Sequence, residues 1–292
     1  PPKGAPKACA VAVPHADQTP EQLAGLAAGD AFALRLARSG CRVLVPALID
    51  RRDELSGNPR LNRQTNIPHR EFVHRMAYEM GRTLAGLEVQ KVLAAVDWFA
   101  SQDARSKVGV IGYGDGGMLA LYAGALDERL AAVQVAGYFG QREKLHEEPI
   151  DRNVWGLLTE FGDAELALMV HPQQFAAVLN MPGPKWDGPT TAKPGRGGAA
   201  PGRLAAFNSP ELEERRYHDA FDRTPRNAAD RVVVGGGLLE DLVPIRGFLS
   251  QLGIEPRDLD AVQVPGAKFP DPVVRHKRQF DQLVAFSQKL WR

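Results

Sequence analysis

The sequence predicts an α/β domain, doubly wound around a mostly parallel β-sheet. Short apolar segments of strand type alternate with longer segments of helical periodicity, as in chains whose parallel strands are joined by helices. The composition is that of a folded globular protein, with 44% hydrophobic and 24% charged residues and a formal net charge of +1 over 292 residues. This balance argues against a disordered chain and against a nucleic-acid-binding protein. No apolar run approaches the about 18 residues of a membrane-spanning helix, so no membrane span is expected.

Short apolar runs mark the expected strands. Cys9 and Cys41 each open such a run, which favours two small buried strand residues over a disulfide. Pro14 ends the first run, and the third run leads directly into a glycine-rich turn at residues 112–117. The expected strands cover residues 8–13, 41–48, 108–111, 131–136, 175–179 and 231–234.

Apolar residues three and four positions apart mark the expected helices. The longest stretch, 70–102, carries an apolar stripe that includes Val89, Val92 and Val96, and Gly81 is a candidate break point together with Gly86. The other expected helices cover residues 31–39, 118–125, 211–221, 242–252 and 272–291, with short helices in 141–170.

Two segments show neither the short apolar runs of the expected strands nor the apolar spacing of the expected helices. Residues 49–69 are polar and predict a long loop, while residues 182–203 are rich in Gly and Pro and predict a surface insertion. We expect an α/β domain over residues 1–253 and a C-terminal extension over 254–292, whose helix docks on that domain. The chain begins Pro1-Pro2-Lys3 without Met, which suggests a processed or trimmed chain. The sequence leaves open a secreted or periplasmic location and a larger multidomain protein.

The glycine-rich turn after strand 108–111 has two interpretations. Gly112, Gly114 and Gly117 satisfy the G-x-G-x-x-G spacing of a dinucleotide site, where glycines let the backbone approach a pyrophosphate. Against this interpretation, the next strand ends Val135-Ala136-Gly137 without the acidic residue that would hold a ribose, and Asp115 would place a negative charge beside the phosphates.

The second interpretation is a nucleophile elbow, G-x-S-x-G, in which a strained turn raises a nucleophile above the sheet. Gly112 and Gly116 supply the two spaced glycines, and Gly114 stands between them. The frame of the elbow is therefore present, and the side chain that would react is absent.

Strand, helix and elbow together make the chain resemble the α/β-hydrolase fold, in its dienelactone hydrolase and acetyl xylan esterase branch. The resemblance runs over most of residues 7–253. It is carried by the helical segment 87–99 before the elbow strand, by the elbow itself, and by Gly137-Tyr138-Phe139-Gly140 after the following strand. The resemblance implies a three-layer α/β/α fold and an esterase-like activity. It assigns the elbow and its oxyanion-like turn to Gly112, Tyr113, Gly114, Gly116 and Gly117.

The same resemblance implies that the positions of the catalytic triad are vacated. The nucleophile position holds Gly114, the position of the acid holds Asn180, and the histidine loop holds Gly236. We therefore expect a non-catalytic, hydrolase-like domain that binds a ligand or a partner. The alternative is a carboxylic ester or lactone hydrolase in which Asp115 acts with a nearby histidine, His15, at the end of the first strand.

Other polar clusters suggest binding rather than catalysis. His69, Glu71 and His74 do not share one helical face cleanly, so no metal site and no cofactor are expected. His276 lies beside Arg275 and Lys277, which indicates a solvated charged face. The arginines of the long loop either clamp the carboxylate or sulfate of a small, carbohydrate-derived ligand, or pair with the neighbouring Asp50, Asp53 and Glu54. These arginines are Arg51, Arg52, Arg60, Arg63 and Arg70.

Overall fold

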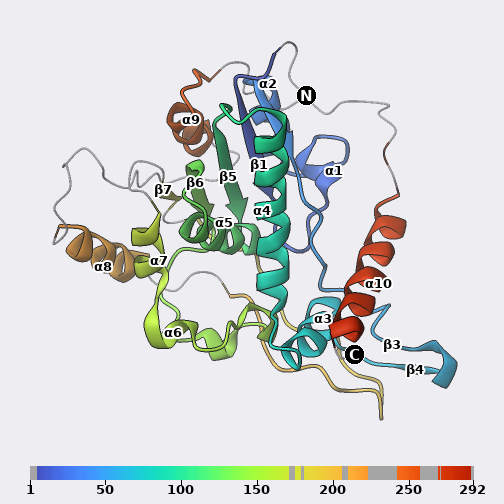
Figure 1. The fold of residues 1–292 in the computed structure, drawn as a ribbon. Coiled ribbons are helices and arrows are strands. Elements are labelled where there is room, and N and C mark those ends of the chain that lie inside the picture. The colour runs from blue at the N-terminus through green and yellow to red at the C-terminus, as the bar shows by residue number, and fades with distance from the viewer. Residues whose placement is uncertain are drawn as a thin grey trace.

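The computed structural model describes residues 5–170, 175–178, 181–205, 210–222, 242–256, 269 and 271–290. At its centre is a five-stranded sheet in the order β2-β1-β5-β6-β7, and every pair of neighbouring strands is parallel (Figure 1). The strands are β1 (Ala8–Val13), β2 (Cys41–Leu44), β5 (Val108–Tyr113), β6 (Leu130–Ala136) and β7 (Phe175–Val178). The strand expected at 231–234 lies outside the described residues.

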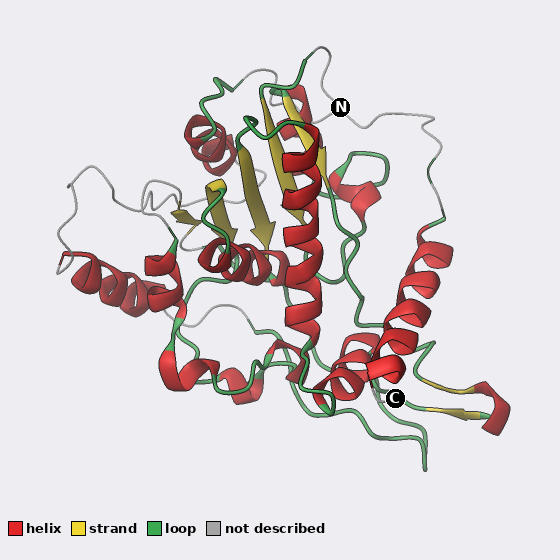
Figure 2. Ribbon diagram, viewed as in Figure 1, coloured by secondary structure: helices red, strands yellow, loops and turns green. Residues whose placement is uncertain are grey.

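Helices cover both faces of this sheet (Figure 2). One face is covered by α4 (Leu84–Gln102), α5 (Asp115–Leu126) and α7 (Asp163–Met169), and α8 (Pro210–Asp222) packs against α7. The other face is covered by α2 (Phe32–Arg38) and α9 (Leu242–Gln251). Alternate residues of a strand point to opposite faces, so Val11 packs under α4 while Ala10 packs under α2. The predicted doubly wound, three-layer α/β/α fold is confirmed.

The polar segment 49–69 is more structured than a loop. It contains an antiparallel hairpin of β3 (Gly57–Asn58) and β4 (Arg63–Gln64) around the 3-10 turn η1 (Pro59–Leu61), and it leads into α3 (His69–Tyr78). A helix break predicted within 70–102 occurs at Gly81, whose φ of 68° ends the turn after α3. Gly86 stays inside α4, where its N–H caps the helix on the Thr83 hydroxyl at 3.0 Å.

Further short elements lie in the connections that follow β1 and β6. They are α1 (Pro20–Leu23), η2 (Leu145–Glu147), η3 (Ile150–Arg152) and α6 (Leu157–Glu160). The Gly/Pro-rich residues 181–205, which we call the strap, lie against α3: Glu71 accepts the N–H of Ala200 at 2.8 Å, and Arg75 donates to the carbonyl of Gly198 at 2.9 Å. No helix in the described part of the chain is long and apolar enough to cross a membrane.

The C-terminal helix α10 (Pro272–Leu290) packs beside α3 (Figure 1). Its Phe280 is buried in a small core with Val73 and Leu84. Two polar contacts add to this packing: Arg275 pairs with Glu21 of α1, and Gln279 donates to the carbonyl of Ala47 at 3.1 Å. The helix expected at 272–291 is thus present and docked, while the domain boundary at residue 253 stays a prediction.

Candidate functional site

The carboxyl ends of β1 and β5 form the topological switch point of the sheet. From β1 the chain moves outward to β2, and from β5 it moves the opposite way to β6 and β7. Open α/β sheets bind ligands in the crevice above such a point. His15 follows β1 there, and Gly114 follows β5.

Residues 112–116 make the sharp strand-to-helix turn that the elbow interpretation expects. Gly114 joins β5 to α5 with φ 57° and ψ −116°. A Cβ on Gly112 would lie 2.0 Å from the carbonyl oxygen of Gly116, and a Cβ on Gly116 would lie 2.1 Å from that of Val13. Side chains are therefore excluded at both flanking positions, which is the physical reason for the glycine spacing.

The space above Gly114 is filled. A Cβ built on Gly114 would lie 2.6 Å from Cγ of Pro184, in the strap, and 3.2 Å from Cβ of His15. The strap is held here by a hydrogen bond from the Tyr113 hydroxyl to the carbonyl of Pro182 at 3.0 Å. The place that a nucleophilic side chain would need is thus taken by a proline, and nothing in the sequence around Pro184 indicates this contact.

Asp115 is fully buried and its carboxylate is fully engaged. Arg51 Nη2 lies 2.8 Å from both carboxylate oxygens, Arg152 Nε donates to Oδ1 at 2.9 Å, and the N–H of Ala16 donates to Oδ2 at 3.1 Å. Burial raises the pKa of Asp115, but the two guanidinium groups outweigh it and hold this pKa well below its usual range. Asp115 is therefore ionised near neutral pH, and both of its carboxylate oxygens accept hydrogen bonds.

Asp115 is one link in a chain of alternating charges. On one side Arg51 also contacts Asp17 at 3.2 Å, and on the other Arg152 contacts Glu148 at 3.0 Å. Beyond Glu148 the series continues through Arg142 to Asp163, with a separation of 2.9 Å for the last pair. We call this series the ion-pair chain. It ties together the segments after β1, β2 and β6 and the start of α5.

His15 is partly buried and makes no hydrogen bond to Asp115 in the described part of the chain. Its Nδ1 accepts the N–H of Asp17 at 3.1 Å, and its ring lies edge-on to Tyr113 with 5.8 Å between centroids. Burial lowers the pKa of His15, so the ring is neutral near pH 7 and carries its proton on Nε2. The neutral ring consequently has no free lone pair with which to act as a base.

The arginine clamp expected in the loop is not formed. Arg51 is taken up by Asp17 and Asp115, and the fully buried Arg70 pairs with Glu88 at 2.9 Å and Asp151 at 2.6 Å. Arg52 pairs with Asp50 and lies near Glu54, while Arg60 and Arg63 belong to the exposed hairpin. The pairing that we predicted with loop carboxylates therefore holds for Arg52. The buried Arg51 and Arg70 pair instead with carboxylates that lie far away in the sequence, and local patterns do not predict such pairs.

A cavity of about 70 Å³ opens beside the ion-pair chain, at the carboxyl end of β6. Arg142 and Arg152 line it, and Glu148 lies between them. Lys144 and Arg203 also line it, are exposed, and form no ion pair among the described residues. The exposed Glu147 lines it as well, so the cavity holds four cations and two carboxylates, and two of the cations, Lys144 and Arg203, are placed to meet an anion.

The histidines of α3 and α10 lie in different surroundings. His74 and Glu71 turn away from His69: His74 faces the N–H of Leu84, and Glu71 faces Arg75 and the strap. The prediction that His276 lies on a solvated face is wrong, because its side chain is only 10% exposed and meets His69. Two other predicted positions, Asn180 and Gly236, lie outside the described residues.

The family model described as the dienelactone hydrolase family matches residues 22–168. This chain belongs to the dienelactone hydrolase family. No curated protein and no solved structure matches it. The matched stretch of this family member includes the elbow and the three residues Arg51, Asp115 and Arg152. His15 precedes that stretch, and both Pro184 and His276 follow it, so the filled nucleophile position involves a residue outside the matched part.

Proposed function

We propose that this member of the dienelactone hydrolase family does not catalyse acyl transfer and uses its strand-end cleft to bind a small anionic ligand. The observation that carries the proposal is Gly114, in the elbow conformation, with Pro184 packed over the place of the nucleophile. Covalent hydrolysis by a hydrolase of this type needs a nucleophile and a base within hydrogen-bond reach. Gly114 has no side chain to attack with.

The alternative, an ester or lactone hydrolase that uses Asp115 and His15, is disfavoured by the same contacts. An attacking carboxylate needs an accessible oxygen, and both oxygens of Asp115 accept hydrogen bonds in a fully buried position. A general base needs a free lone pair, and Nδ1 of His15 is occupied by the N–H of Asp17. Either residue would have to break these contacts before it could react.

A direct test combines p-nitrophenyl acetate with a fluorophosphonate probe. We expect turnover equal to that in buffer and no labelling, with an active serine esterase run in parallel to prove the sensitivity of the assay. Turnover above buffer that disappears in both Asp115→Asn and His15→Gln would refute the proposal in favour of the alternative. The His15 variant is needed because Asp115→Asn is expected to be unstable for structural reasons.

The ligand class follows from the cavity beside Arg203. Lys144 and Arg203 are positive and unengaged by acidic groups among the described residues, whereas Arg142 and Arg152 hold the rear wall in place. A charge-assisted hydrogen bond contributes about 1.5–3 kcal/mol. We therefore expect Arg203→Gln to weaken the binding of a small anion by about tenfold or more.

The binding test is calorimetric titration with inorganic phosphate and, separately, with citrate at low ionic strength. Lys193→Gln is the matched control, since Lys193 is an exposed cation of the same strap outside the cavity lining. Equal affinities for wild type, Arg203→Gln and Lys193→Gln would mean that anions do not bind in this cavity. Added salt should weaken a genuine interaction because exposed charges are screened.

A further inference from the structure

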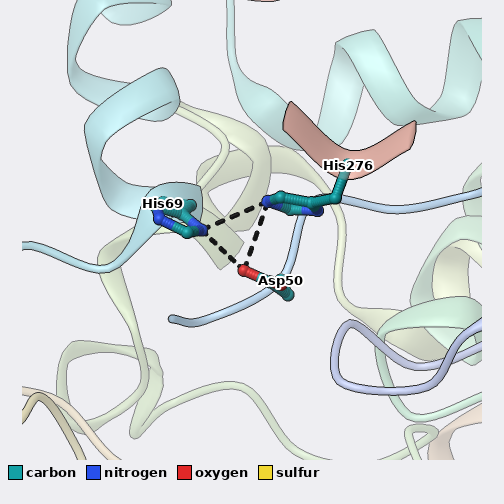
Figure 3. A group of neighbouring side chains, drawn as sticks. All are labelled: Asp50, His69 and His276. Carbon is teal, nitrogen blue, oxygen red and sulfur yellow. Dashed lines mark hydrogen bonds and ion pairs between the residues drawn. The ribbon is translucent and has the colours of Figure 1, made fainter. Parts of the chain in front are cut away.

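A second polar cluster lies away from the cleft, where α10 docks on α3. It consists of Asp50, in the loop after β2, His69, at the start of α3, and His276, in the second turn of α10 (Figure 3). Nδ1 of His69 lies 2.6 Å from Oδ1 of Asp50, and Nε2 of His276 lies 3.2 Å from that nitrogen and 3.4 Å from that oxygen. Three potential ligand atoms from three distant segments thus converge on one point.

The spacing and the donor types suit a divalent transition metal. Ligand atoms about 2.0–2.1 Å from a tetrahedral Zn²⁺ stand about 3.3 Å apart, and both distances from His276 Nε2 have this value within 0.1 Å. The contact between Asp50 and His69 is shorter, so it would have to open by roughly 0.7 Å to reach that spacing. Two imidazoles and one carboxylate form a set that binds Zn²⁺ and its first-row neighbours.

The surroundings hold these three groups as an outer ligand shell would. Arg52 donates its Nε–H to Oδ2 of Asp50 at 2.6 Å and its backbone N–H to Oδ1 at 3.2 Å, and these bonds fix the carboxylate with Oδ1 beside the two rings. Phe280 packs against the His69 ring with 5.2 Å between centroids. Outer contacts of this kind orient metal ligands.

The cluster also has an opening to solvent. Asp50 and His276 line one end of a cavity of about 250 Å³, bounded by the segment 16–20 and by the start of α10. This volume is ample for a water molecule, which needs only about 10–15 Å³. A metal bound by the three side chains could therefore enter from the cavity and complete its coordination with water.

The position of the proton on the His69 ring determines what must change when a metal ion binds. Nε2 of His69 accepts the N–H of Leu55 at 2.8 Å, so in the metal-free cluster the neutral ring carries its proton on Nδ1, facing Asp50. A cation on Nδ1 needs that proton removed, and a neutral ring then carries one on Nε2. Nε2 can carry that proton only after the N–H of Leu55 moves off this nitrogen, and the Glu54 carboxylate, now 3.7 Å from Nε2, would then have to approach to accept it. Binding of a metal ion on Nδ1 therefore exchanges one tautomer of His69 for the other and breaks the hydrogen bond from Leu55.

We infer that Asp50, His69 and His276 form a binding site for a divalent transition metal of the Zn²⁺ class, which fastens α10 to the body of the domain. The ligands are separated by up to 226 residues, from Asp50 to His276. A single ion would consequently link the segment after β2, α3 and α10. This site is independent of the anion-binding cavity and does not depend on the proposed function.

The test uses the full chain, stripped with EDTA, and Zn²⁺ as the only added ligand. We expect one Zn²⁺ bound per chain by elemental analysis after desalting, a melting temperature that rises with Zn²⁺, and binding at least 100-fold weaker in His276→Ala. Co²⁺ in place of Zn²⁺ should give visible absorption bands typical of a four-coordinate ion. These bands should vanish in His276→Ala.

Two controls keep the result decisive. His218→Ala removes a partly exposed histidine of α8, which lies 3.8 Å from Glu214 and edge-on to the Tyr217 ring, and the variant should bind Zn²⁺ like wild type. Asp50→Asn, together with circular dichroism of every variant in EDTA, distinguishes a lost ligand from a lost fold. Zn²⁺ affinity in folded His276→Ala and Asp50→Asn equal to wild type, or no bound Zn²⁺ in wild type at all, would overturn the assignment.

Discussion

Asp115→Asn is expected to lower the free energy of unfolding by about 3–5 kcal/mol, the usual cost of breaking a buried ion pair by removing one partner. The amide can still accept the N–H of Ala16, but it no longer balances Arg51 and Arg152, whose side chains are 2% and 6% exposed. Two cations would then face each other in a water-poor environment. Denaturant unfolding followed by circular dichroism measures the loss.

The matched control is Asp97→Asn. Asp97 also pairs with an arginine, Arg129, at 2.7 Å, but its side chain is 65% exposed. Surface ion pairs contribute about 0–1 kcal/mol, so this change should be nearly neutral. If the two variants lose similar amounts of stability, burial of the ion-pair chain is not what makes Asp115 important.

The effect of Asp115 should also depend on pH in one direction. Its pKa in the folded state lies below that of an unfolded aspartate, which is about 3.9. The stabilisation by the anion is therefore complete above that unfolded value and is lost as the pH falls through the lower folded value. The difference in unfolding free energy between wild type and Asp115→Asn should be constant at neutral pH and shrink under strongly acidic conditions. A difference that grows on acidification would contradict the assigned charge state.

The residues that sequence reasoning found are those with a local signature. The elbow was predictable because Gly112, Gly114 and Gly116 follow a buried strand at fixed spacing, and backbone contacts at 2.0 and 2.1 Å show why no other residue fits at Gly112 and Gly116. The strand β1 was predictable in the same way, because its apolar run ends at Pro14. Both features arise from neighbours within a few positions along the chain.

The residues that sequence reasoning missed depend on contacts between distant segments. Pro184 fills the site from 70 positions after Gly114, and Arg51 reaches Asp115 from 64 positions before it. No periodicity records such pairs. His276 is different, because it lies four residues before Phe280, on the same side of a helix. That spacing was a usable signal for the buried face, and the charged neighbours Arg275 and Lys277 concealed it.

Gly116→Ala is expected to destabilise the domain by about 3 kcal/mol or more, at the upper end of the cost of overpacking. The added methyl group would lie 2.1 Å from the carbonyl oxygen of Val13 and 2.5 Å from that of Pro14. These oxygens belong to β1 and the turn that follows it, and cannot move without displacing the Asp115 contact to Ala16. Gly247→Ala is the control, since Gly247 lies in α9 with no heavy atom within 4 Å of its added Cβ.

Alanine in a helix is favoured over glycine by about 1 kcal/mol, so Gly247→Ala should raise the melting temperature while Gly116→Ala lowers it. The same substitution thus gives opposite signs at two helical glycines. The sign at Gly116 tests whether α5 must approach β1 this closely for the elbow to form. An unchanged melting temperature in Gly116→Ala would mean that the elbow can relax to admit a side chain. Only the contact of Pro184 in the strap would then keep a side chain out at Gly114.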